Sequence, residues 1–161
     1  MSGQQPLNDE MDDIGADSRE QTRIWHYLSA ILGGFIAAGI LAALLSLLDR
    51  AGLEWASPQQ DWAFGIAFVA AWIILSFMFV WKAATVRRVL VRVLSVIGLE
   101  WLAAAATGMA LLNYPAPSLS GLPPLIAFMA SPRLFAAMLA MLGLVLGGAF
   151  LFAAFLIFRE S

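Results

Sequence analysis

The stretch IWHYLSAILGGFIAAGILAALLSLL, residues 24–48, decides the fold, because it contains no aspartate, glutamate, lysine or arginine. Three further apolar stretches follow it, at residues 62–81, 93–112 and 134–158. A bilayer has a hydrocarbon core of about 30 Å, which about 20 helical residues cross. The sequence therefore predicts an all-α integral membrane protein in which these stretches are transmembrane helices.

The composition points to the same class of protein. Hydrophobic residues make up 61% of the chain, charged residues make up 12%, and the mean hydropathy is +0.84, whereas a soluble domain is about half apolar and about a quarter charged. Backbone groups inside a bilayer must be paired within the protein, so a span is a helix or part of a closed barrel. The continuous apolar runs favour helices. The absence of cysteine excludes disulfides and thiol redox chemistry.

We expect a single domain, a four-helix bundle over residues 18–161, preceded by a disordered acidic tail at residues 1–17. Ser57 and Pro58 form a typical helix start. No glycine or proline separates the second helix from the third, so we predict a tight turn near residues 83–86. The expected helices are 18–48, 58–83, 86–112 and 132–158.

Basic residues indicate the orientation, because cytoplasmic flanks carry the excess of Lys and Arg. The first and third connections carry only Arg50 and Arg133. The opposite side has seven basic residues: Arg19, Arg23, Lys82, Arg87, Arg88, Arg92 and Arg159. We therefore expect a multi-pass protein of the cell membrane with both termini in the cytoplasm.

The outer connection between the third and fourth helices, residues 113–133, is rich in proline. It also contains the apolar segment Leu122–Met129, which is too short to cross a bilayer. We expect this segment to lie in the membrane interface or to cover the helix ends. A lid over an external cavity is the alternative.

Glu100 is the one charge-capable residue deep within a predicted span. It lies about 20 Å along the third helix, close to mid-bilayer, where an ionised carboxylate costs about 2.5 to 3.5 kcal/mol. Trp72 lies at a similar depth on the second helix. We predict that its indole N–H donates to Glu100, or that a protonated Glu100 bonds a backbone carbonyl or water. Glu100 and Trp72 are therefore the candidate intramembrane polar site.

Small residues recur at helical spacing on the first and last predicted helices. They include Gly34 and Ala38 on the first and Gly143 and Gly147 on the last. Helices in lipid associate through close packing, which small residues allow. We expect these faces to pack against neighbouring helices, within the chain or in a homo-oligomer or partner complex.

The second connection and the start of the third helix are strongly basic, with Lys82, Arg87, Arg88 and Arg92. A Lys or Arg near an anionic membrane surface contributes about 1 kcal/mol of attraction. These four residues are candidate contacts for lipid headgroups, or they act only as a topology signal.

The sequence favours no enzymatic activity. It shows no nucleophile beside a base, no paired carboxylates, no metal-ligand set and no glycine-rich phosphate loop. We therefore expect no cofactor, no metal and no nucleic-acid partner. The favoured function is that of a small structural or accessory membrane protein, which interacts with the bilayer and with other membrane subunits or itself. The alternative is a transporter or channel-like subunit in which Glu100 binds a proton or cation.

Overall fold

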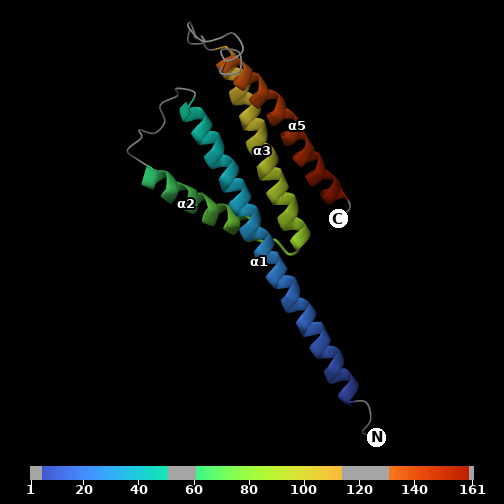
Figure 1. Cartoon of the computed structure of the whole chain (residues 1–161). Helices are drawn as coiled ribbons and strands as arrows, with labels where there is room; N and C mark the ends of the chain where they lie inside the picture. Colours follow the sequence, from blue (N-terminus) through green and yellow to red (C-terminus); the bar gives the residue numbers. More distant parts are fainter. Residues whose placement is uncertain (1–4, 51–60, 114–130, 160–161) are drawn as a thin grey trace.

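The computed structural model describes residues 5–50, 61–113 and 131–159, and the regular structure in these ranges is helical (Figure 1). The helices are α1 (Gln5–Arg50), α2 (Asp61–Val80), α3 (Val86–Leu112) and α5 (Pro132–Arg159). All 4 are long and apolar enough to cross a membrane. The prediction of four helices with the length and hydropathy of membrane spans is therefore confirmed.

Helix α1 is longer than a membrane span requires. Its 46 residues correspond to about 69 Å at about 1.5 Å per residue, whereas its apolar span covers Gln21–Ser46. The N-terminal part of α1 projects away from the other helices (Figure 1).

The start of α1 differs from the sequence prediction. The helix begins at Gln5 rather than near Ser18, so it includes most of the segment that we expected to be disordered. A physical reason is available in helix cooperativity, because extending an existing helix adds one hydrogen bond per residue without a new nucleation cost. The segment also contains no proline after Pro6, which lies in the first turn, where proline is tolerated.

Two other sequence predictions lie outside the described residues. One is the helix start at Ser57 and Pro58, and the other is the proline-rich connection with its apolar segment Leu122–Met129.

The turn between α2 and α3 occupies residues 81–85, slightly earlier than predicted. Lys82 adopts the left-handed conformation with a φ of 53°, which reverses the chain just after α2 at a position where glycine is usual. Thr85 then caps α3, because its side-chain oxygen accepts a hydrogen bond from the backbone N–H of Arg88 at 3.3 Å. The turn was predicted slightly too late because no glycine marks its position in the sequence.

The helices lie in the spatial order α2, α1, α3, α5 (Figure 1). The packing of α3 against α5 is the most extensive, followed by α1 against α2 and then α1 against α3, while α2 and α3 touch only slightly. The four helices therefore form an open row. A small core lies where α1, α2 and α3 meet, and it contains Ala30, Ala37, Phe79, Val89, Val93 and Ile97.

Helix α2 is the least enclosed of the four. Only 6% of the most apolar 18-residue segment of α2 is buried, whereas 33% of the corresponding segment of α3 is buried. Ile66, Ile73 and Phe77 are all more than half exposed. Most of α2 therefore faces the surroundings of the protein along the membrane span.

Candidate functional site

Glu100 lies on α3 and is partly buried. Its carboxyl oxygen Oε2 is buried and has no hydrogen-bond partner among the residues that the structure describes. An unpaired buried polar atom costs about 1 to 3 kcal/mol. The carboxyl group of Glu100, which the sequence predicted as a polar site, therefore has one oxygen without a hydrogen bond in the described structure.

Trp72 does not bond to Glu100, so that predicted pair is wrong. The indole Nε1 donates to the backbone carbonyl of Ile31 on α1 at 3.0 Å. The ring also meets Phe35 edge to face, with 5.6 Å between ring centroids. The physical reason is the lateral arrangement of the helices, because α2 packs against α1 and has little contact with α3. Equal depth in the membrane did not bring the two side chains together.

Replacing Trp72 by phenylalanine should lower the free energy of unfolding by about 0.5 to 1.5 kcal/mol, the usual net value of one hydrogen bond. Thermal unfolding followed by circular dichroism in a mild detergent would measure the change. Trp81→Phe is the matched control, because Trp81 is 56% exposed. Equal shifts in Tm for the two variants would contradict the assigned hydrogen bond between α2 and α1.

Two of the four basic residues hold the ends of neighbouring helices. Nη1 of Arg92 donates to the carbonyls of Met78 at 3.2 Å and Phe79 at 3.4 Å, and also to that of Trp81. The last carbonyls of a helix lack partners within the helix and carry the negative end of its dipole. Arg92 therefore provides both hydrogen bonds and a compensating charge at the end of α2.

Arg87 likewise provides a hydrogen bond and a positive charge at the end of α5. Its Nε donates to the carbonyl of Ile157 at 3.1 Å, close to the end of that helix. Helix α5 runs antiparallel to α3, and α2 crosses obliquely with its end near the start of α3, so the final turns of both helices lie beside the first turns of α3 (Figure 1). The side chains of Lys82 and Arg88, the other two basic residues, are exposed.

A groove of about 630 Å³ lies between the last turns of α2 and the first turns of α3. Its apolar walls include Phe77 and Met78 from α2 and Val91 and Val96 from α3. Lys82 and Arg92 also line it. We refer to this feature as the α2–α3 groove.

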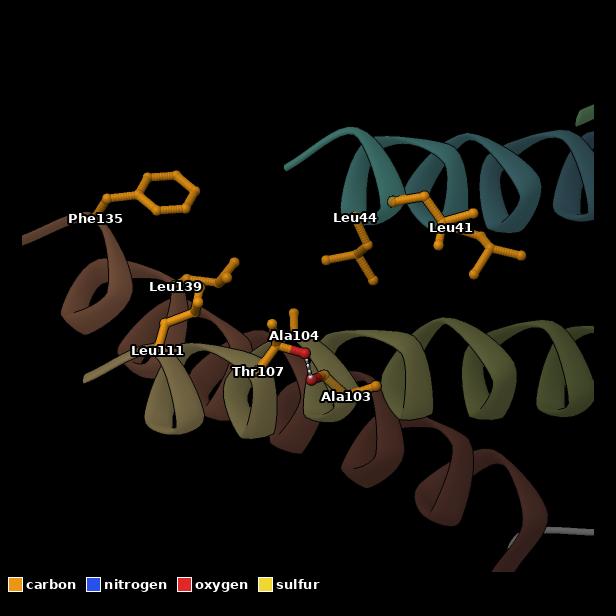
Figure 2. Close-up of a pocket in the computed structure, with 9 residues that line it drawn as sticks. Leu41, Leu44, Ala103, Ala104, Thr107, Leu111, Phe135 and Leu139 are labelled. Atoms are coloured by element: carbon orange, nitrogen blue, oxygen red, sulfur yellow. Dashed lines mark hydrogen bonds between the residues drawn. The ribbon is translucent and has the colours of Figure 1, made fainter. Parts of the chain in front are cut away.

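A second cavity, of about 130 Å³, lies between α1, α3 and α5. Figure 2 shows its leucine side chains and Phe135 around a central space. The hydroxyl of Thr107 lines the cavity but donates to the carbonyl of Ala103 on its own helix at 2.9 Å. Glu100 lines neither this cavity nor the α2–α3 groove.

The small residues predicted for packing lie at close helix contacts. A Cβ atom built on Gly143 would lie 2.5 Å from the carbonyl oxygen of Trp101, and one on Gly147 would lie 2.9 Å from that of Gly98, so α5 approaches the backbone of α3 at both positions. Gly34 lies against Ser76 of α2, and Ala38 is buried. These four positions serve contacts within the chain.

Sequence reasoning missed Ser76. Its Oγ is the second buried polar atom without a hydrogen-bond partner in the described part of the chain. A signal was present, since Ser76 carries the only hydroxyl group in the apolar stretch 62–81. Within the described ranges, no three His, Asp or Glu side chains are grouped closely enough to hold a metal ion.

Comparisons with protein-family models, with curated proteins and with solved structures gave no match for this chain.

Proposed function

We propose that this protein is a structural or accessory membrane subunit, and that it binds another membrane protein or a second copy of itself side by side in the bilayer. The observation that carries the proposal is the side chain of Glu100, which is only partly buried on α3 and whose Oε2 atom has no hydrogen-bond partner in the described residues. A helix from a partner could supply the missing hydrogen-bonding group, since polar side chains link helices in membranes.

The exposed surface of α2 supports lateral association. Among the described residues only 6% of the apolar span of α2 is buried, so α2 offers an apolar surface against which a further helix could pack. Lipid would also satisfy an apolar surface, because acyl chains are as apolar as leucine. Lipid tails offer no hydrogen bond to a carboxyl group, however, and for that reason Glu100 rather than the exposed area favours a protein partner.

The helices and their charges support a proposal for the location. With an even number of spans both termini would lie on the same side of the membrane, and the excess of Lys and Arg near the α2–α3 turn favours the cytoplasm. We therefore propose a multi-pass protein of the cell membrane with both termini in the cytoplasm. Labelling of single cysteines placed in the tail and in the α2–α3 turn, on intact cells, tests this orientation.

Glu100→Leu should have opposite effects on the assembly and on the isolated chain. Loss of the carboxyl group should remove the partner, or shift the oligomer to monomer, when the protein is purified in mild detergent. The monomer itself should become more stable by about 1 to 3 kcal/mol, since an unpaired buried polar atom is removed. Native mass spectrometry and thermal unfolding measure the two effects.

Thr107→Val is the control, because the Thr107 hydroxyl is already bonded within α3. It should leave the assembly intact. An assembly of unchanged composition in Glu100→Leu, or a wild-type protein that is monomeric without a stoichiometric partner, would show that the proposal is wrong. Proton or cation flux in proteoliposomes that is lost in Glu100→Gln, with the assembly unchanged, would establish the transporter alternative instead.

A further inference from the structure

The α2–α3 groove joins an apolar wall to two positive charges. Its volume of about 630 Å³ falls within the range of about 300 to 1,000 Å³ that is common for small-ligand sites. Met78 and Phe77 line it from α2 and Val96 lines it from α3, while Lys82 and Arg92 lie toward the turn. A ligand that fits this surface has an apolar chain and a negatively charged head.

Arg92 is held in place before any ligand arrives. Its Nη1 is fixed by the carbonyls of Met78, Phe79 and Trp81, while no described residue accepts a hydrogen bond from its Nε or Nη2. A guanidinium group with its position fixed in this way retains donors that suit a phosphate, and less conformational entropy is lost on binding. Arg92 can thus support the end of α2 and contact an anion at the same time.

Lys82 occupies a position where its side chain carries a conformational cost. Its φ of 53° lies in the left-handed region, which glycine adopts without penalty and other residues rarely adopt. Glycine would form the same turn at lower cost. The lysine at this position lines the α2–α3 groove and adds a positive charge to it.

We propose that the α2–α3 groove binds an anionic glycerophospholipid, with its phosphate between Lys82 and Arg92 and an acyl chain along Phe77, Met78 and Val96. The charge of the groove supports this choice of ligand, since Lys82 and Arg92 are both positive and no acidic residue in the described part of the chain lines the groove. The turn beside the groove lies at the end of two membrane spans, where lipid headgroups are found. Glu100 does not line this groove, so the lipid site does not depend on the role proposed for Glu100.

Native mass spectrometry of the purified full chain, titrated with phosphatidylglycerol and separately with phosphatidylcholine, tests the site. The wild type should prefer phosphatidylglycerol. Lys82→Gly and Lys82→Gln should each weaken binding of phosphatidylglycerol about fivefold, which corresponds to the contribution of about 1 kcal/mol from one lysine at an anionic surface. Lys82→Gly should also retain or raise the Tm, so weaker binding in that variant would not reflect a damaged fold.

Arg159→Gln is the matched control. It removes one positive charge from the same side of the protein, at the exposed end of α5, and should leave the preference for phosphatidylglycerol unchanged. An equal loss in Arg159→Gln and Lys82→Gln would mean that only net charge attracts the lipid, and this would overturn the site. Displacement of the lipid by millimolar glycerol phosphate would overturn the acyl-chain contact. A lower dimer fraction in Lys82→Gln would identify a second copy of the chain as the occupant.

Discussion

Gly143→Val should break the close packing of α3 against α5 and lower the free energy of unfolding by about 1 to 3 kcal/mol or more. A Cβ atom at this position would lie 2.5 Å from the carbonyl oxygen of Trp101 and 2.6 Å from the backbone nitrogen of Ala105. Backbone atoms cannot rotate away as a side chain can, so the two helices would have to separate. Thermal unfolding in mild detergent, followed by circular dichroism, measures the loss.

Gly148→Val provides a control on the same helix. A Cβ atom on Gly148 would meet nothing within 4 Å, so this variant adds the same atoms without a steric clash. Its stability should stay within about 0.5 kcal/mol of the wild type, as for surface substitutions in general. Similar losses for the two valine variants would show that α5 does not present the Gly143 face to α3.

Arg92→Met should cost about 1.5 to 3 kcal/mol, the range for hydrogen bonds that involve a charged group. The substitution keeps an unbranched side chain but removes the donor that three carbonyls at the end of α2 share. The last turn of α2 should therefore fray. Hydrogen–deuterium exchange should rise over residues 77–82 and stay low in the centre of α3.

Arg88→Met separates this effect from a simple loss of charge. Arg88 lies on the same helix and its side chain is exposed, so its replacement should change stability by less than about 0.5 kcal/mol. If exchange over residues 77–82 rises equally in both variants, the protection arises from the basic character of the region and not from the bonds of Arg92.

The helices themselves were predictable because a membrane span needs a long apolar run and little else. The bounds of α3, Val86–Leu112, coincide with those expected from the sequence. The structure explains the start of α3 by the cap at Thr85, a signal that the sequence analysis did not use. The end of α2 was misplaced because Lys82 takes the conformation that usually requires glycine.

The environment of Glu100 could not be predicted in the same way. Distance along a helix gives the depth of a residue, but it does not say which helices are neighbours in the plane of the membrane. Lipid and leucine are equally apolar. The hydropathy of α2 therefore cannot predict whether α2 packs against α1 or against α3. For this reason Trp72 was assigned to Glu100 when it in fact bonds to Ile31.

The basic residues show a similar limit. Arginines near a span were interpreted as a topology signal or as lipid contacts. Arg87 and Arg92 donate to carbonyls at the ends of α5 and α2, a role that depends on those helices ending beside the start of α3. The sequence identified these arginines as candidate sites, but the carbonyls to which they donate could be identified only from the structure.

The arrangement of the helices also determines the order in which their contacts can form during synthesis. Chains fold from the N-terminus as they emerge from the ribosome, and the bond from Trp72 to Ile31 requires nothing that follows α2. The carbonyls at the end of α2 can accept hydrogen bonds from Arg92 only after α3 has been synthesised. Helix α5 is synthesised last, after the helix against which it packs. A truncated chain that ends after α2 should therefore form the contact between α1 and α2, while the end of α2 stays loose until Arg92 has been synthesised.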